Sequence, residues 1–205
     1  MIIIRLKGGM GNQLFQYAFG LNLANKLGVE LRLDLSSLLD RSKGDFVYRN
    51  YDLSIFKVEA DFLTSPSLLK KVYQFKSSTI TKLIRNRINK GRYFIKEVDF
   101  HFQQDLIDQA QLNSIYEGWF QSERYFDDVK DLLRKQLTFK YQLLSRSQSL
   151  LHYIQSCNSI CLNVRRTDFL KVDNLNTTNK DYFLKAAEYL AKKVENPVFF
   201  IFSDG

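Results

Sequence analysis

The chain has 205 residues, of which 45% are hydrophobic and 25% charged, and its nine glycines and two prolines exclude a collagen-like or low-complexity chain. The longest apolar run, Val198 to Phe202, is far shorter than the about 20 residues of a membrane span and the about 7 of a secretory h-region, which predicts a cytoplasmic protein. The formal net charge of +8 favours anionic partners over cationic ones.

The N-terminal residues predict a βαβ unit. Residues 2–6 are apolar except for Arg5, which predicts a short buried strand. A glycine-rich stretch at residues 8–13 follows, and then a helical pattern that ends at Gly28. Residues 29–35 alternate between apolar and polar, which predicts a second strand parallel to the first.

The glycine-rich stretch, Gly8-Gly9-Met10-Gly11-Asn12-Gln13, is a candidate ligand loop. Glycines let the backbone approach a ligand closely, and free amide groups at a helix start favour an anionic or strongly polar ligand. The stretch is neither a full G-x-G-x-x-G fingerprint nor a Walker loop. A purely structural tight turn would have the same residues.

A basic segment occupies the middle of the chain. Residues 70–96 contain nine Lys or Arg and no acidic residue, and apolar residues from Ile80 to Ile88 recur at helical spacing. This basic amphipathic helix either packs its apolar stripe on the protein core or attracts an anionic membrane surface or substrate. Nucleic acid is disfavoured, because the aromatic residues are not regularly spaced. A second helical periodicity extends over residues 126–144.

The segment 117–126, EGWFQSERYF, contains the only Trp together with other aromatic, amide and carboxylate side chains. Aromatic faces and planar polar groups bind sugars, so the composition suits a carbohydrate. A segment that packs between two lobes would have the same composition.

A second α/β unit is predicted from Ser159 onward. It comprises a strand at 160–164, a helix that opens at Thr178 with Asp181 as its capping partner, and the apolar strand 198–202, which is typical of a parallel sheet covered on both faces. We therefore predict an α/β fold with a Rossmann-like lobe at residues 1–158 and the start of a second, incomplete lobe at residues 159–205.

Arg165-Arg166-Thr167-Asp168 follows the predicted strand 160–164. Ligands of open α/β sheets bind at strand carboxyl ends, and two adjacent arginines suit a diphosphate. Asp168 could hold one guanidinium in place. The alternative is a surface salt bridge.

The residue types that bind metals or form disulfides are scarce. His101 and His152 are the only histidines and lie far apart, with no Cys or His at ligand spacing, so a zinc site is not expected and metal-independent chemistry is favoured. No cofactor is predicted. Cys157 and Cys161 are interpreted as plain buried or half-buried thiols. No G-x-S-x-G element indicates a serine hydrolase.

Four motifs in order, GGMGNQLFQYAFG, EGWFQSERYF, NVRRTD and FIFSD, resemble glycosyltransferase family 11, the α-1,2-fucosyltransferases. The resemblance implies a GT-B-like arrangement of two Rossmann-type lobes and an inverting, metal-independent mechanism. It also implies GDP-fucose as co-substrate and the 2-hydroxyl of a galactoside as acceptor. A lipid-linked acceptor would bring the protein to the inner face of the membrane as a peripheral protein.

The resemblance also assigns roles to residues. Arg165 and Arg166 would neutralise the donor diphosphate, and Asp168 would orient them. The general base is unassigned, with Asp168, Glu117 and Glu123 as candidates. The acceptor-side residues would be Glu117, Gly118 and Gln121. The donor-binding residues would be Gly9, Gly11, Asn12, Gln13, Asn163, Ser203 and Asp204.

The chain departs from the family pattern at two positions. Asn163 stands where the family has His, and Gly205 stands where it has a second Asp. The family also continues beyond this last motif. The alternatives are a truncated, inactive relative with residual ligand binding, or a basic module that binds a membrane or nucleic acid.

Overall fold

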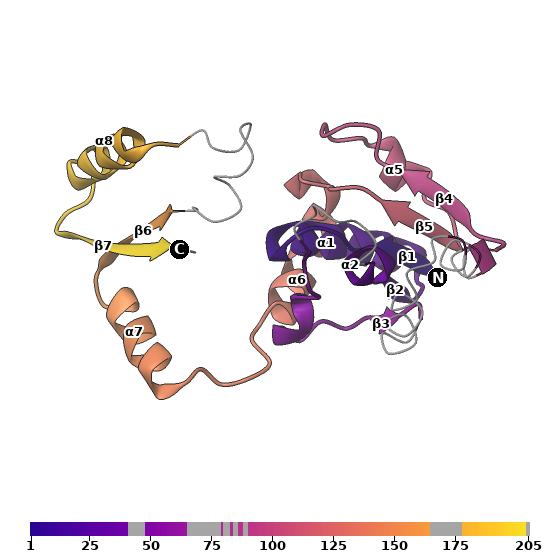
Figure 1. The fold of residues 1–205 in the computed structure, drawn as a ribbon, viewed down its shortest axis with the longest axis horizontal. Coiled ribbons are helices and arrows are strands. Elements are labelled where there is room, and N and C mark those ends of the chain that lie inside the picture. The colour runs from indigo at the N-terminus through magenta and orange to yellow at the C-terminus, as the bar shows by residue number, and fades with distance from the viewer. Residues whose placement is uncertain are drawn as a thin grey trace. The chain divides into compact units, whose positions relative to one another are not determined.

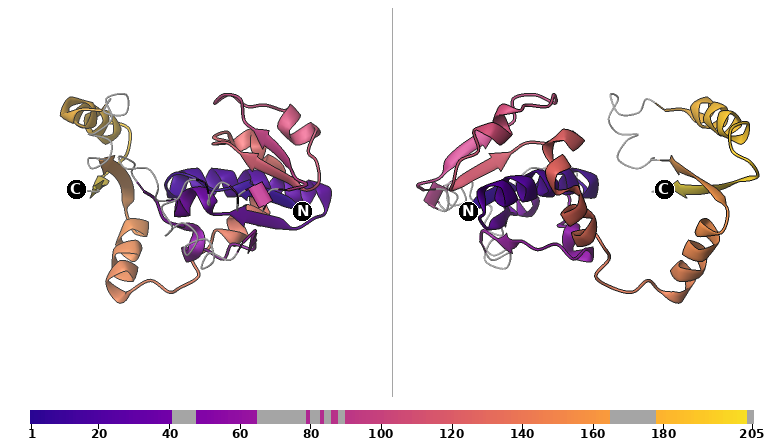
Figure 2. Two further views of the ribbon diagram at one scale, coloured as in Figure 1. Left: turned by 45° about the vertical axis from the view of Figure 1, so that its right-hand side comes forward. Right: turned by 180° about the vertical axis from the view of Figure 1, so that it is seen from behind.

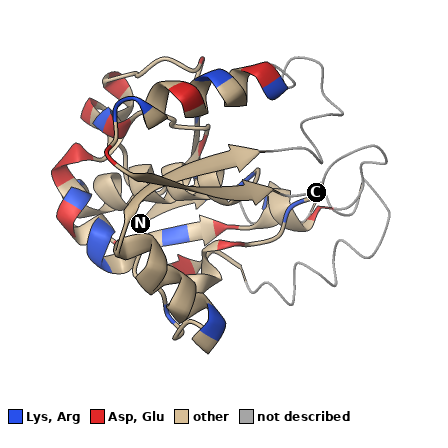
Figure 3. Ribbon diagram, turned by 90° about the vertical axis from the view of Figure 1, so that its left-hand side faces the viewer, with Lys and Arg blue, Asp and Glu red and all other residues tan. Residues whose placement is uncertain are grey.

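The computed structural model describes residues 1–40, 48–64, 79, 83, 86–87, 90–164 and 178–203 (Figure 1). The chain divides into two compact units, Met1–Tyr141 and Gln142–Gly205. Each unit has a parallel sheet, which confirms the predicted α/β fold class. Most charged residues lie on helices and connecting segments (Figure 3).

A five-stranded parallel sheet forms the centre of the first unit. The central strand is completely buried, as predicted for residues 2–6, and Ile2 pairs with Leu31 of the predicted second strand. The strands, in sheet order, are β3 (Asp61–Phe62), β2 (Leu31–Asp34), β1 (Ile2–Arg5), β5 (Ser114–Glu117) and β4 (Tyr93–Lys96).

Helix α1 (Met10–Leu27) lies against the sheet (Figure 2). It ends as predicted at Gly28, whose φ of +62° is left-handed and whose amide bonds to the carbonyls of the last turn. The other side of α1 contacts the short 3₁₀ turns Leu53–Ile55, Glu123–Tyr125 and Asp127–Val129. A helix covered on several sides is buried around most of its circumference, which is why α1 shows little amphipathic pattern.

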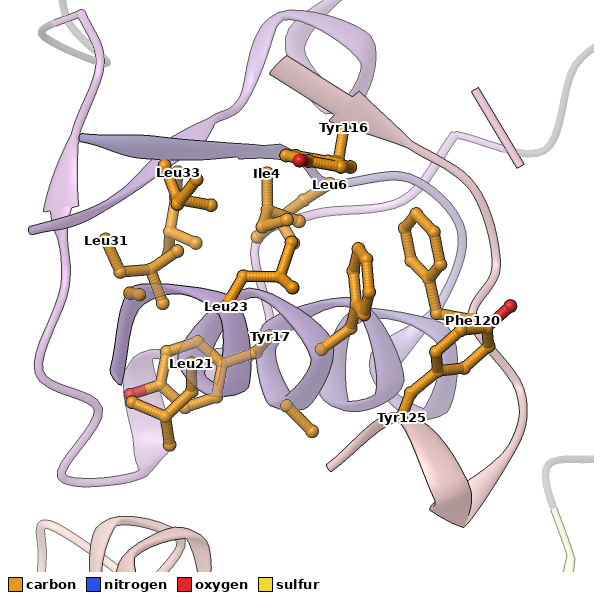
Figure 4. Close-up of a cluster of buried hydrophobic side chains, with 14 of the residues drawn as sticks. Ile4, Leu6, Tyr17, Leu21, Leu23, Leu31, Leu33, Tyr116, Phe120 and Tyr125 are labelled. Atoms are coloured by element: carbon orange, nitrogen blue, oxygen red, sulfur yellow. The ribbon is translucent and has the colours of Figure 1, made fainter. Parts of the chain in front are cut away.

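Aromatic rings fill the core between α1 and the sheet (Figure 4). Phe19 is completely buried, and its ring stacks on Phe120 at a centroid distance of 4.0 Å. Tyr125 and Tyr116 meet the same ring edge-on at 5.1 and 5.5 Å. This packing ties α1 to β5 and to the segment that follows it.

The helical pattern at residues 126–144 predicts a longer helix than the one that the structure contains. Within it, the structure contains a 3₁₀ turn and helix α6 (Lys130–Gln136), and the helix ends there. Residues 138–140 instead bond to residues 55–57, with Lys57 donating to Thr138 and Lys140 donating to Ile55. This antiparallel contact competes for the backbone groups that a longer helix needs. Two further short helices are α2 (Ser36–Leu39) and α5 (Asp105–Asp108).

The second unit contains α7 (Ser145–Gln155), β6 (Asn158–Val164), α8 (Lys180–Ala191) and β7 (Pro197–Ser203). Strands β6 and β7 are parallel, in agreement with the predicted second α/β unit. The compact unit that contains these strands begins at Gln142, since α7 packs on them through Tyr153 and Phe200. The lobe boundary at Ser159 stays a prediction. The cap of α8 is Asn179 and not Thr178: the Asn179 side chain accepts from the amide of Tyr182 at 3.0 Å.

Strand β7 is not covered on both faces, contrary to the prediction. Ile201 is 69% and Phe202 46% exposed, and no described residue of this unit is fully buried. Cys157 is half-buried as expected, but Cys161 is exposed, so its predicted burial is wrong. The physical reason is that a two-stranded sheet with two helices cannot enclose a core of its own.

Most of the basic segment lies outside the described residues, including Ile80, Ile84 and Ile88 of the predicted apolar stripe. Within it, Leu83 has helical backbone and is 63% exposed. Across the described parts of the chain, no helix is both long and apolar enough to cross a bilayer.

Candidate functional site

Four neighbouring strands of the first unit end at charged residues, at the carboxyl edge where parallel sheets bind ligands. Arg5 lies opposite Asp34 in the pairing of β1 with β2. The pairing of β1 with β5 places Arg5 beside Glu117, and Glu117 lies opposite Lys96. The signs therefore alternate along what we call the charged row: Asp34, Arg5, Glu117 and Lys96.

Arg5 is the centre of the charged row. Its Nε donates to Asp34 Oδ2 at 2.8 Å, and its Nη1 donates to Glu117 Oε2 at 2.9 Å. Burial lowers the pKa of Arg5, but the two carboxylates outweigh that effect and raise it. Arg5 is therefore a permanent cation, although its side chain is only 7% exposed. Its Nη2 is buried without a hydrogen-bond partner among the described residues, which is costly.

Lys7 lies next to the charged row in the loop after β1. Its Nζ is 4.4 Å from the ring centroid of Trp119 and 4.0 Å from Glu117 Oε1. Burial lowers the pKa of Lys7, and the negative charge of Glu117 opposes that shift. The ammonium is thus held between an aromatic face and a carboxylate.

The glycine loop requires Gly8 for two reasons. Its φ of +77° is left-handed, and a Cβ built there would lie 2.5 Å from Asn12 Nδ2 and 3.1 Å from the Trp119 ring. Gly9 precedes α1 as the N-cap residue, without a side-chain cap. Gly11 is in the first turn of α1, and a Cβ there would meet nothing within 4 Å.

The structure brings the glycine loop and the segment 117–126 together. Gln121 Nε2 donates to Asn12 Oδ1 at 2.6 Å, and both residues were predicted for the site. Gln16 bonds to both segments, since its Nε2 donates to the carbonyl of Gly118 at 3.1 Å and its Oε1 accepts from the amide of Lys7. Three predicted residues, Asn12, Gly118 and Gln121, therefore lie in one place.

Gln13 holds the glycine loop from inside the protein. It is completely buried, and its Nε2 donates to the carbonyls of Gly8 and Asn50 at 2.9 and 2.8 Å. Its Oε1 accepts from the amide of Asp52 at 2.9 Å. A side chain so engaged positions the loop.

Gly118 is required by close packing. A Cβ at this position would lie 2.6 Å from both the Glu97 Cβ and the Phe120 ring. The carboxylate of Glu97 accepts from the amides of Trp119 at 2.6 Å and of Phe120 at 3.1 and 3.2 Å. Glu97 thereby fixes the turn after β5, in which Phe120 has a left-handed φ of +51°.

The predicted donor-side residues of the second unit are described only in part. Asn163 is exposed in β6, and Ser203 is the last residue of β7, opposite Val164. Both strands therefore end at the same edge of their sheet. Arg165, Arg166, Asp168 and Asp204 lie outside the described residues.

Sequence analysis did not identify Arg5, Lys7, Asp34 or Glu97 as site residues. A usable signal existed for two of them, because Arg5 interrupts the apolar run of the first strand and Asp34 falls near the end of the second. Their mutual contact depends on which strands pair. That information is not local in the sequence.

Gly8→Ala is expected to lower the free energy of unfolding by about 2 to 4 kcal/mol, the combined cost of a left-handed alanine and of overpacking. Gly11→Ala, three residues later, is the matched control and should leave stability unchanged or raise it by up to about 1 kcal/mol, because alanine favours helix. Urea unfolding followed by the fluorescence of Trp119 measures both. Equal stabilities of the two variants would contradict this role of Gly8.

Comparison with known proteins identifies a protein family that matches the whole chain. A family model described as Glycosyl transferase family 11 matches residues 1–205. An alpha-1,2-colitosyltransferase of Escherichia coli is 28% identical over 211 residues, which cover 100% of this chain and 69% of the relative. The O-antigen biosynthesis glycosyltransferase WbnK of Escherichia coli is 26% identical, over 97% of this chain and 71% of the relative.

A solved structure has a similar fold. It is NodZ alpha-1,6-fucosyltransferase soaked with GDP-fucose, which matches with a TM-score of 0.50 and 15% sequence identity. The match covers 100% of this chain and 71% of that structure. The α/β fold of this chain is therefore similar to the fold of that fucosyltransferase structure.

Proposed function

Because the chain belongs to glycosyl transferase family 11, we propose that it transfers fucose from GDP-fucose to the 2-hydroxyl of a galactoside. The observation that carries the proposal is the family match over all 205 residues. The meeting of the glycine loop with the segment 117–126, at the carboxyl edge of the first sheet, supports it further. The reaction is proposed to be inverting and to use no metal or other cofactor.

On the donor side, Arg165 and Arg166 would pair with the diphosphate, and Asp168 would orient them. Two guanidinium groups can supply the positive charge that a metal supplies in other transferases. The remaining donor residues are proposed to be Gly9, Gly11, Asn12, Gln13, Asn163, Ser203 and Asp204. Gln13 supports the same loop through its buried hydrogen bonds.

On the acceptor side, Glu117, Gly118 and Gln121 are proposed to border the galactoside. Gln121 is exposed, so a sugar hydroxyl could reach its side-chain amide while the bond to Asn12 holds that amide in place. Gly118 allows the backbone to pass closely behind Glu97. Gly118 itself is buried and its carbonyl accepts from Gln16, so its proposed part is to shape the turn that carries Gln121.

A second donor, colitose, is favoured by one observation: a relative at 28% identity is described as an alpha-1,2-colitosyltransferase. The test incubates the protein with GDP-fucose or GDP-colitose and a β-galactoside, and detects the product by mass spectrometry. Fucosylated product supports the proposal. Faster transfer of colitose would replace the donor, and no product from either sugar nucleotide would contradict the proposed function.

A peripheral contact with an anionic membrane is proposed for a lipid-linked acceptor. Support comes from the nine basic residues in 70–96 and from exposed apolar residues that follow them, Val98 at 86% and Phe100 at 69%. The protein is expected to sediment with vesicles that contain anionic lipid, and to be released when salt is raised from about 0.1 to 1 M, because salt screens surface charge. Equal binding to neutral vesicles would contradict this contact. The cytoplasmic location stays a prediction.

A further inference from the structure

The two carboxylate oxygens of Glu117 differ in their surroundings. Oε2 accepts from Arg5 at 2.9 Å, so it is fixed. Oε1 lies 4.0 Å from Lys7 Nζ, and no described residue donates a hydrogen bond to it. The Glu117 side chain is 22% exposed, against 7% for that of Arg5, so it is in part accessible to solvent. Glu117 therefore presents a held carboxylate with one open oxygen at the carboxyl edge of the sheet.

Other carboxylates in this region lack that combination. Both oxygens of Glu97 accept from backbone amides after β5. Asp34 is buried, and its two oxygens accept from Arg5 and from the amide of Ser36. Glu123 is exposed in a 3₁₀ turn, without a described cation to hold it. Among these candidates, only Glu117 is both held and accessible.

We infer that Glu117 is the general base of the transfer reaction and that Arg5 and Lys7 are its positioning residues; this inference rests on the proposed function. The acceptor hydroxyl oxygen bonds to the anomeric carbon of the donor sugar while the bond from that carbon to the GDP phosphate oxygen breaks. The electron pair of the broken bond leaves with GDP. The hydroxyl proton passes to Oε1 of Glu117 and then to solvent.

The charges around Glu117 suit this step. Arg5 and Lys7 hold the carboxylate from two sides, and Arg5 retains Asp34 as a partner once Glu117 has accepted the proton. The hydroxyl becomes more acidic as its oxygen bonds to carbon, so a carboxylate is a sufficient base. The titratable and charged groups that face Glu117 come from the neighbouring strands and loops. They are Arg5 in β1, Lys7 in the loop after β1, Asp34 in β2, Lys96 in β4 and Glu97 directly after β4.

Glu117→Gln tests the inference in the full chain. It is expected to lower kcat by about 10² to 10⁴-fold, while the KM for GDP-fucose and the affinity for GDP change by less than about threefold. The fall of kcat/KM in acid, which the wild type should show, disappears in the variant. Glu123→Gln is the matched control and should retain kcat within about twofold.

A second variant separates catalysis from folding. Adding formate to Glu117→Ala should restore at least a tenth of the lost rate, because the small carboxylate can enter the vacated space. Asp34→Asn removes the other partner of Arg5 and should lower the melting temperature while the acid fall of kcat/KM remains.

Each failure has a separate meaning. Wild-type rates for Glu117→Gln, or a rate that formate leaves unchanged in a folded Glu117→Ala, would overturn the inference alone. A wild-type protein that makes no fucosylated or colitosylated product would overturn the proposed function, and this inference with it.

Discussion

Replacing Arg165 and Arg166 together with alanine is expected to lower kcat/KM for GDP-fucose by at least about 10⁴-fold. A charge-assisted hydrogen bond contributes about 1.5 to 3 kcal/mol, and the two arginines are proposed to act in both donor binding and bond breaking. GDP affinity should fall by about 100-fold in the same variant. Steady-state kinetics and calorimetric titration with GDP measure the two effects.

Arg134→Ala is the matched control for this double variant. Arg134 is 75% exposed on α6 and, within the described residues, pairs with Asp131 at the surface, so its loss should change kcat/KM by less than about twofold. Replacing Arg165 and Arg166 with lysine should restore part of the GDP affinity but not the full rate, because lysine lacks the planar fork. GDP affinity that is unchanged in the double alanine variant would contradict the proposed donor site.

Phe19→Ala is expected to lower the free energy of unfolding by about 3 to 5 kcal/mol. The ring is completely buried and contacts the rings of Phe120, Tyr116 and Tyr125, so its removal leaves a cavity between α1 and β5. Urea unfolding followed by Trp119 fluorescence reports the change within the first unit.

Phe100→Ala provides the comparison for an exposed ring. Phe100 is 69% exposed, and its removal should change stability by less than about 0.5 kcal/mol. Similar losses in both variants, or a loss below about 1 kcal/mol for Phe19→Ala, would contradict the described core.

Local patterns were sufficient to predict both α/β units. The first strand, the glycine loop and α1 follow one another within 27 residues, and each has its own signal in composition, periodicity and capping. A helix that connects two strands of one sheet then predicts the parallel pairing of β1 with β2. The same reasoning identified β6 and β7 in the second unit.

Two of the errors come from parts of the fold that are distant in sequence, and one comes from a local hydrogen bond. Residues 138–140 have helical periodicity, yet their backbone bonds to residues 55–57. The cap of α8 is one residue later than predicted, because Asn179 reaches the amide of Tyr182. The exposure of β7 depends on how many strands flank it, and no periodicity within the strand contains that number.

The candidate site was predictable in its motifs but not in its charges. The glycine loop and the segment 117–126 were identified separately, and the pairing of β1 with β5 brings them together. The charged row joins residues 29 and 112 positions apart in the chain, as in the bonds of Arg5 to Asp34 and Glu117. Strand order therefore has to be known before Glu117 can be distinguished from Glu123 as the base.

The most direct test of the proposed chemistry is the nuclear magnetic resonance spectrum of the disaccharide unit formed from GDP-fucose and a β-galactoside. An inverting α-1,2-fucosyltransferase should produce fucose in the α configuration on the 2-hydroxyl of galactose. Fucose in the β configuration, fucose on another hydroxyl, or unreacted GDP-fucose beside a folded protein would contradict the account.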